Sequence, residues 1–348
     1  MPIMPNFIER LILFKLNLAP GVMLDMLGAA AFLALSTALK LGIFETLSGG
    51  PMTSTEIARK IEADERGTVL LLEAVEALGY VKKRKDTWAN TAMTTKWLLR
   101  LSPNCLASGF ALFESLLERW RYLADSIRLG KPVMLAWDWL DQNPGRWRDY
   151  QAAMLAMARM VSDDVVSKVK LASTARRLLD VGGGHGLYSI KFCRRYPTLS
   201  ATVFDWPQSL DVARETIDAE NMSDQVMVQE GDFWIDDLGT DHDVALLFNI
   251  IHGFSPEKNT MLFRKVASAL NSGGQIVIMD QLAGKVSGPT ARAVTRLQGL
   301  NLFNEVGGQT YTFDEIAHWL VAAGFTGMRR INLRKTPGFG LVLGNKAS

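Results

Sequence analysis

The 348-residue sequence predicts an α/β protein in which a mostly parallel sheet, with helices on both faces, follows a mainly helical N-terminal domain. Two observations carry this prediction. From residue 177 onward, strand-like segments alternate with helical patterns, which is typical of a doubly wound parallel sheet. A turn with four glycines follows the first of these strands, where such sheets bind ligands. The length suits more than one domain.

Composition narrows the class of protein. About half of the residues are apolar (48%) and the net charge is only +2, which gives no electrostatic footprint for nucleic acid. The two cysteines form no disulfide framework, so we expect a cytoplasmic protein with reduced thiols. The first 18 residues lack a signal-peptide core. Residues 26–39 are apolar but too few to span a bilayer, so we expect a buried helix and no membrane partner.

Residues 1–103 are interpreted as an apolar arm, 7–14, followed by a winged-helix domain. Thr53 and Glu56 form a capping box, which marks the start of a helix. Asp64 is placed to cap the next helix. The other expected elements are helical patterns over 24–47 and 68–78 and a strand pair over 80–84 and 86–91.

A winged helix raises the alternative of DNA binding. Its recognition helix would be residues 66–78, which carry Glu73 and Glu76 and a single basic residue, Arg66. Such a helix is too acidic and too apolar to lie against phosphates. The sequence therefore favours packing against a second subunit.

Residues 104–170 are expected to form a helical connector, with helices over 106–128 and 146–170 around a loop rich in Pro, Trp and Asp. Tyr150, Met154 and Met157 recur at helical spacing in the second helix. Methionines in this pattern commonly fill a hydrophobic core. Next to a ligand-binding domain, they could also line a pocket for an aromatic substrate.

The spacing of the glycines in the turn indicates the class of ligand that the turn can bind. An apolar strand ends at Asp180 and Val181, and glycines follow at 182, 183, 184 and 186. Glycine lets the backbone approach a ligand, and the next helix contributes free N–H groups. The dinucleotide fingerprint needs a third glycine where Leu187 or Ser189 stands. The turn therefore fits a ligand without a pyrophosphate.

Acidic residues follow the next two strands. Asp205 ends the second strand about twenty residues after the turn, where a carboxylate can accept hydrogen bonds from a ribose diol. Asp232 and Phe233 follow the third strand and suit the amino group and ring face of adenine. Acids at such positions also cap turns. Their order along the sheet favours an adenosine site.

Four segments carry a family resemblance: 178–186, Phe204-Asp205-Trp206-Pro207, Gly231-Asp232-Phe233 and 271–274. With them, the chain resembles the class I S-adenosylmethionine-dependent O-methyltransferases that act on small molecules, of the caffeic-acid and hydroxyindole type. The resemblance implies a winged-helix dimerisation domain, a homodimer, a Rossmann-like catalytic domain over 171–348 and no metal. It also implies that the sheet ends antiparallel, with candidate strands Met328–Leu333 and Gly340–Gly344.

The resemblance further implies which residues contact S-adenosylmethionine and its product S-adenosylhomocysteine. The expected cofactor contacts are Asp180, Gly182, Gly184, Asp205, Asp232, Phe233 and Asn249.

The same resemblance implies a catalytic base. Residues 248–255 are similar to the family's L-H-D-W-S segment, which makes His252 the base and Asp280 the acid that orients it. A phenol with a pKa near 10 is mostly protonated at pH 7, so a base within hydrogen-bond reach assists its reaction. The second acid of the plant enzymes falls on Thr310; Glu305 either replaces it or faces solvent.

We therefore expect a methyltransferase acting on a hydroxyl of a small aromatic or hydrophobic acceptor. Three alternatives stay open: methylation at carbon, a relative that does not consume its cofactor, and a winged-helix regulator that senses a ligand. The residues expected to line the acceptor pocket are Tyr150, Met154, Met157, Phe303 and Glu305.

Overall fold

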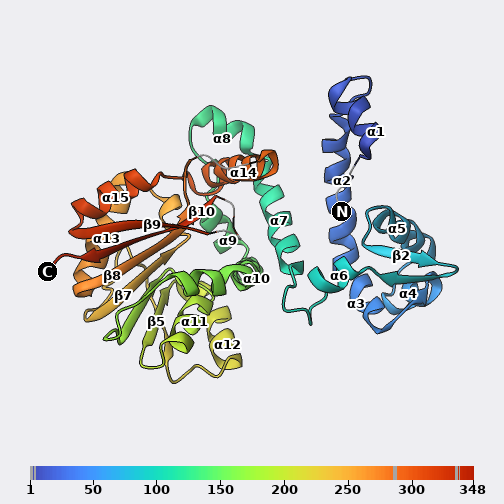
Figure 1. Ribbon diagram of the computed structural model, residues 1–348. Coiled ribbons are helices and arrows are strands. Elements are labelled where there is room, and N and C mark those ends of the chain that lie inside the picture. The colour runs from blue at the N-terminus through green and yellow to red at the C-terminus, as the bar shows by residue number, and fades with distance from the viewer. Residues whose placement is uncertain (1–2, 4, 285–287, 334–335, 337) are drawn as a thin grey trace. The chain divides into compact units, whose positions relative to one another are not determined.

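The computed structural model describes residues 3, 5–284, 288–333, 336 and 338–348 (Figure 1). The chain divides into two compact units, residues 1–111 and 112–348. Each unit has its own elements and its own hydrophobic core.

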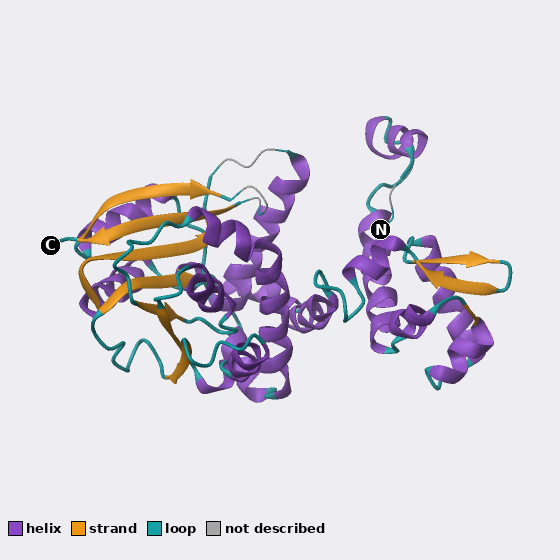
Figure 2. Ribbon diagram, turned by 60° about the horizontal axis from the view of Figure 1, so that its bottom comes forward, coloured by secondary structure: helices purple, strands orange, loops and turns teal. Residues whose placement is uncertain are grey.

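The N-terminal unit is mainly helical and contains a small antiparallel sheet of strand order β1-β3-β2. Figure 2 shows the β2–β3 hairpin, which is the predicted wing. The elements are α1 (Phe7–Arg10), η1 (Leu11–Lys15), α2 (Met23–Lys40), α3 (Ile43–Thr46), η2 (Leu47–Gly49), β1 (Met52–Thr53), α4 (Ser54–Lys60), α5 (Glu65–Ala77), β2 (Val81–Arg84), β3 (Thr87–Asn90) and α6 (Ala92–Trp97).

Local capping explains two helix starts. The Thr53–Glu56 capping box is present at α4, and the Asp64 carboxylate accepts a hydrogen bond from the Gly67 N–H at 2.7 Å at the start of α5. Both predictions are confirmed. The single helix expected over 24–47 is wrong, because Gly42 adopts a left-handed conformation (φ 72°) and separates α2 from α3.

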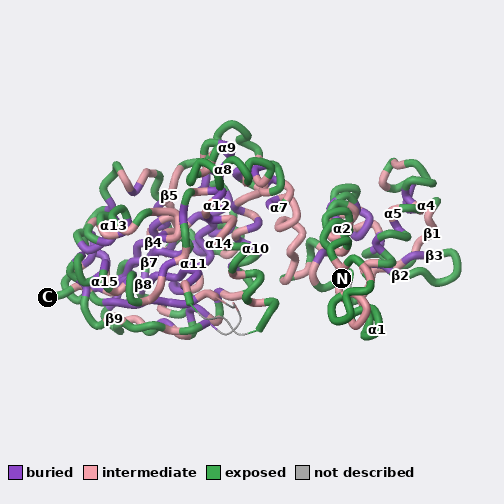
Figure 3. The backbone as a smooth tube through the Cα atoms, turned by 90° about the horizontal axis from the view of Figure 1, so that it is seen from above, coloured by how far each residue is buried: buried purple, intermediate pink, exposed green. Residues whose placement is uncertain are grey.

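The helix α2 is largely exposed in the single chain (Figure 3), and the expectation that it is buried is wrong. Of its residues, only Leu35, Ser36 and Ala38 are buried, whereas Met26 is 73% exposed. Within the described part of the chain, α2 is the one helix long and apolar enough to cross a membrane by length and composition. A helix that packs against another protein surface has the same properties.

The C-terminal unit is built on a seven-stranded sheet of order β6-β5-β4-β7-β8-β10-β9. Its first five strands are parallel, and β10 is antiparallel to both β8 and β9, as predicted. The strands are β4 (Arg177–Val181), β5 (Ser200–Asp205), β6 (Val226–Glu230), β7 (His242–Phe248), β8 (Leu270–Gln281), β9 (Phe325–Asn332) and β10 (Phe339–Lys346).

Helices cover both faces of this sheet (Figure 1), which confirms the predicted fold class. One face packs on α10, α11 and α12, and the other on α13 and α15. The helices are α7 (Ala107–Trp120), which contains the unit boundary, α8 (Leu123–Leu129), α9 (Ala136–Gln142), α10 (Gly145–Lys168), α11 (Leu187–Arg195), η3 (Pro207–Ser209), α12 (Asp211–Ala219), η4 (Ile251–Gly253), α13 (Pro256–Ala269), α14 (Pro289–Val306) and α15 (Phe313–Ala322).

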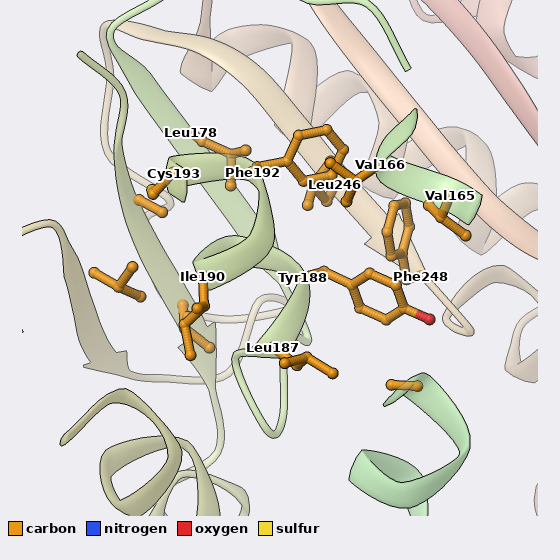
Figure 4. Close-up of a cluster of buried hydrophobic side chains, with 14 of the residues drawn as sticks. Val165, Val166, Leu178, Leu187, Tyr188, Ile190, Phe192, Cys193, Leu246 and Phe248 are labelled. Atoms are coloured by element: carbon orange, nitrogen blue, oxygen red, sulfur yellow. The ribbon is translucent and has the colours of Figure 1, made fainter. Parts of the chain in front are cut away.

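Neighbouring strand residues serve opposite cores because side chains alternate across a strand. Leu178 of β4 packs with α10 and α11, and Leu179 packs with α13. Figure 4 shows the first core, where Tyr188 of α11 meets Phe248 of β7 edge to face, with ring centroids 4.7 Å apart. Both faces of the central strands are thereby buried, which holds their carboxyl ends in fixed positions.

One predicted helix and one predicted loop in the connector differ from the structure. The pattern over 106–128 is interrupted at Arg121 and Tyr122, which separate α7 from α8. The loop expected over 132–144 contains α9, whose residues Trp139 and Leu140 are buried against Trp147. Tertiary packing of these large rings outweighs the turn-forming composition of the segment.

Candidate functional site

The glycine turn joins β4 to α11, and its shape excludes side chains. Gly182, Gly184 and Gly186 all have positive φ, which glycine tolerates best. A Cβ added at Gly182 would lie 2.3 Å from the Cδ1 of Ile250. A Cβ at Gly183 would lie 2.7 Å from the Cγ of Asp180. The turn can therefore bring its backbone close to a ligand.

Asp180 lies beneath the turn, where it is 1% exposed. Its carboxylate accepts a hydrogen bond from the Ser189 hydroxyl at 2.8 Å. Burial raises the pKa of Asp180 to about 7, and the nearby charge of Asp205 adds to this increase. This carboxyl therefore supports the turn from below.

Asp205 ends β5 and faces the same turn from the side. Its carboxylate accepts hydrogen bonds from the Gly184 N–H at 2.8 Å and the Trp206 N–H at 2.7 Å. Burial raises the pKa of Asp205 to about 6, against the effect of these donors. A carboxylate has about four acceptor positions, so Asp205 retains capacity for further donors.

A cavity of about 590 Å³ opens at the carboxyl ends of β5 and β6. Asp232, which follows β6, lines this cavity. Sequence reasoning missed Asp141, which reaches the cavity from α9 and accepts a hydrogen bond from the Trp147 indole N–H at 3.1 Å. The lining residues are Asp141, Trp206, Pro207, Gln208, Glu230, Gly231, Asp232 and Asp236.

Phe233 packs beside this cavity and is 9% exposed. Its ring meets Phe254 edge to face, with centroids 5.9 Å apart. The Lys265 ammonium donates to the Phe233 carbonyl oxygen at 2.8 Å and so fixes this turn. Asn249, just past β7, adopts φ 59° and donates its N–H to the Met279 carbonyl at 2.8 Å. This sharp turn redirects the chain into η4.

His252 and Asp280 meet at the carboxyl ends of β7 and β8. The distance from His252 Nδ1 to Asp280 Oδ1 is 2.7 Å, and the His252 backbone N–H donates to Asp280 Oδ2 at 3.3 Å. The Asp280 carboxylate is 1% exposed and the imidazole is 21% exposed. An ionised carboxylate only accepts, so Nδ1 carries the proton and Nε2 is left as an acceptor.

Two of the other described histidines make local contacts. His185 lies in the glycine turn, and its Nδ1 accepts a hydrogen bond from the Leu187 N–H at 3.1 Å. Burial lowers the pKa of His185 to about 4. His242 is buried, with Nε2 3.2 Å from the Leu238 carbonyl oxygen. Within the described ranges, no group of three or more His, Cys, Asp or Glu side chains could hold a metal.

The predicted acceptor-pocket residues occupy two helices. Tyr150 of α10 belongs to an aromatic cluster with Trp137, Trp147 and Trp206, and Trp137 stacks on Trp147 with centroids 5.9 Å apart. Met154 is half-buried and Met157 is 40% exposed on the same helix. On α14, Phe303 is half-buried.

Glu305 of α14 neither faces solvent nor contacts His252. It is 4% exposed, and its carboxylate forms an ion pair with Arg119 of α7. Burial raises the pKa of Glu305, and Arg119 opposes this effect. Among the described residues, Asp280 is the carboxylate that hydrogen-bonds the His252 ring. The expectation that Glu305 replaces the acid missing at Thr310 therefore receives no support from these contacts.

Comparison with known families identifies the chain. Residues 120–326 match the O-methyltransferase domain, and residues 24–100 match the O-methyltransferase dimerisation domain. The fold and the site thus define a class I methyltransferase. The chain belongs to the O-methyltransferase family and is an S-adenosylmethionine-dependent enzyme.

Three similar proteins illustrate the family. The 3-hydroxy-5-methyl-1-naphthoate 3-O-methyltransferase of Streptomyces sahachiroi is 29% identical over 90% of this chain and 91% of its own. The L-tyrosine C(3)-methyltransferase of Streptomyces lavendulae is 24% identical, over 88% and 86%. The structure of human N-acetylserotonin methyltransferase in complex with SAM has a TM-score of 0.81 at 24% identity and full coverage of both chains.

Proposed function

We propose that this enzyme methylates a hydroxyl oxygen of a small aromatic acceptor and that His252 is the general base. The His252–Asp280 pair carries the proposal. The Nδ1–H of the imidazole is bound to Asp280, with 2.7 Å between Nδ1 and Oδ1, so the lone pair of Nε2 is left for the acceptor hydroxyl, and the side chain is 21% exposed. Such a carboxylate fixes the tautomer and stabilises the imidazolium that forms when the base takes a proton.

The residues around the cavity fit the cofactor. We assign the adenosine part to the cavity lined by Asp232, with Phe233 beside it, and the glycine turn and Asp205 to the adjoining part. Asn249 shapes the chain between β7 and η4. When bound, S-adenosylmethionine supplies a methyl group on a sulfonium. The role of the chain is then to align the acceptor, exclude water and accept the hydroxyl proton at His252 Nε2.

An aromatic acceptor agrees with the relatives and with the side chains near the site. The Streptomyces sahachiroi relative acts on a naphthoate. In this chain, Tyr150, Met154, Met157 and Phe303 offer rings and thioethers on α10 and α14. Such side chains bind flat apolar rings well.

Substitution of the base tests the function. His252→Gln should leave S-adenosylmethionine binding unchanged and lower kcat by about 10²- to 10⁴-fold, the usual contribution of a general base. The measurement is steady-state methylation of 2-naphthol and 3-hydroxy-1-naphthoate. His318→Gln, at an exposed histidine of α15, is the matched control. Full activity in His252→Gln would eliminate the base and favour positioning alone or methylation at carbon.

We further propose that the N-terminal unit forms a homodimer. Its dimerisation-domain match and the exposed apolar residues Phe7 (83%) and Met26 (73%) support this assembly. Light scattering should give twice the chain mass of 38.5 kDa, and Met26→Glu should shift the protein toward monomer because it places a charge on the apolar face. Leu101→Glu, at a 98% exposed loop residue, is the control and should remain dimeric. A monomeric wild-type protein at micromolar concentration would contradict the proposal.

A further inference from the structure

A buried ion pair joins α7 to α14 within the C-terminal unit. The Arg119 guanidinium donates its Nε–H to the Glu305 carboxylate, and the two side chains are 4% and 6% exposed. The guanidinium also lies over the Trp139 ring, 4.6 Å from its centroid. Arginine has five N–H donors in a planar fork, and a single carboxylate bonded at Nε leaves most of them available.

The cluster formed by Arg119, Asn304 and Glu305 contains two polar atoms that lack a hydrogen-bond partner. Among the residues that the structure describes, Arg119 Nη1 and Asn304 Oδ1 are buried without a hydrogen-bond partner. The Asn304 amide is correctly oriented, because its Nδ2 lies 3.4 Å from the Arg119 carbonyl oxygen and 3.4 Å from Glu305 Oε1, which both accept. Buried polar atoms without partners are rare and costly. A donor and an acceptor without partners in one ion-pair cluster could bind a polar group of a ligand.

Contacts connect the Arg119–Glu305 cluster to the cofactor cavity and to the segment that carries His252. Trp139, under the guanidinium, packs in the same aromatic cluster as Trp206, which lines the cofactor cavity. On the other side, the segment after α14 bonds to the base: the Gln309 N–H donates to the His252 carbonyl oxygen at 2.9 Å. Arg119 therefore contacts the aromatic cluster that includes the cavity residue Trp206, and it is paired with α14, whose following segment contacts the His252 backbone.

The pKa of Tyr150 is a second observation that relates the ion pair to the glycine turn. Burial raises the pKa of Tyr150, the charges of Asp205 and Glu305 raise it further, and the Arg119 charge lowers it. The phenol is thus within electrostatic reach of both the glycine turn and the ion pair. The neighbouring residue Gln151 packs directly on the turn, since its Oε1 would lie 2.7 Å from a Cβ at Gly184.

We propose that Arg119 recognises the acceptor, with its free Nη1 donating to a carboxylate or carbonyl oxygen that the aromatic ring carries in addition to its hydroxyl. This inference rests on the proposed function and deepens it, because it names the acceptor class. Glu305 positions the guanidinium, and Asn304 Oδ1 accepts from a donor or from water bound to the same substituent. The alternative is that the pair only fastens α7 to α14.

A matched pair of ligands separates these accounts without requiring catalysis. The probes are 3-hydroxy-1-naphthoate and 2-naphthol, which differ only in the carboxylate, titrated by calorimetry into the full-length protein loaded with S-adenosylhomocysteine. The wild type should bind the naphthoate about 10- to 100-fold more tightly than the naphthol, the usual range for a hydrogen bond between charged groups. A pair that only fastens two helices predicts no such preference.

Variants assign the preference to Arg119. Arg119→Lys keeps a cation beside Glu305 but removes the guanidinium fork, so the preference should fall toward one while naphthol binding is unchanged. Glu305→Gln removes the competing negative charge and should widen the preference. Arg128→Lys, at an exposed arginine paired with Asp125, is the control and should behave as the wild type.

The outcomes are distinct. Equal binding of the two probes by the wild type, no binding of the naphthoate, or an unchanged preference in Arg119→Lys would overturn the inference. If Arg119→Lys loses S-adenosylhomocysteine binding through misfolding, Glu305→Gln decides: a wider preference supports the inference, and an unchanged one overturns it. Methylation of phenols together with equal probe binding would leave the proposed function standing alone. Selective binding without methylation in the same preparation would instead contradict the function.

Discussion

The two halves of the proposed site, one for the cofactor and one for the acceptor, consist of different kinds of chemical groups. The half that we assign to the cofactor consists of backbone N–H groups of the glycine turn and carboxylates at strand ends, and the hydrogen bond from the Gly184 N–H to Asp205 joins the two. The half that we assign to the acceptor consists of rings, thioethers and the Arg119–Glu305 pair, which come from helices far apart in the sequence. The first side is fixed by backbone geometry that the sheet dictates. The second depends on side chains, which can change without altering the fold.

The largest effect is expected beneath the glycine turn. The pKa of Asp180 is about 7 in the folded protein, against an ordinary value of 3.8. The contribution of this carboxyl group to the free energy of unfolding is therefore fully present below about pH 4 and is lost as the pH rises through 7. At pH 8 the burial of this carboxylate costs up to about 4 kcal/mol at 1.36 kcal/mol per unit of pKa. Asp180→Asn should therefore unfold at a higher temperature than the wild type at pH 8. Thermal melts at pH 4 and pH 8 measure the gain, which should vanish at pH 4.

The next effect falls on cofactor binding. Asp205→Ala removes the acceptor of the Gly184 N–H and of the assigned ribose hydroxyls, so the free energy of S-adenosylmethionine binding should become less favourable by about 1.5–3 kcal/mol, with a corresponding rise in Kd. The acceptor KM at saturating cofactor should remain unchanged. Calorimetry measures the first quantity, and Asp211→Ala, at an exposed acid of α12, is the control. An unchanged Kd in Asp205→Ala would remove this residue from the cofactor site.

The smallest effect tests the acceptor side. Met154→Ala should raise the acceptor KM by roughly fivefold, since shortening a half-buried apolar side chain costs about 1 kcal/mol. Cofactor affinity should not change. Met261→Ala, at a 60% exposed residue of α13, is the comparison variant in the same steady-state assay. If Met154→Ala instead weakened cofactor binding, the division into two halves would be wrong.

This division also explains what the sequence could predict. The residues assigned to the cofactor side lie in short contiguous segments of the sequence. The positions of the turn at 182–186 and of Asp205 and Asp232 at strand ends could therefore be predicted from the strand pattern alone. Asp141 was missed because α9 lies in a segment with loop-like composition, and its position depends on the packing of Trp147.

The acceptor side was less accessible to prediction. Arg119 and Glu305 are 186 residues apart, and no local sequence pattern predicts their contact. Glu305 was interpreted as a substitute acid or a solvent-facing residue, whereas packing of α14 against α7 buries it beside a cation. The exposure of α2 was also hidden, because an apolar helix has the same sequence pattern whether a core or a partner covers it.

The central claim is that His252, oriented by Asp280, removes the acceptor proton. The most direct test is the pH–rate profile of methylation for wild type, His252→Gln and Asp280→Asn, with phenolic acceptors of different acidity. We predict that the loss in His252→Gln shrinks at high pH and with more acidic phenols, because those acceptors need less help losing the proton. Asp280→Asn should cost less, since the base itself remains. A His252→Gln profile that matches the wild type across the whole pH range would contradict the account.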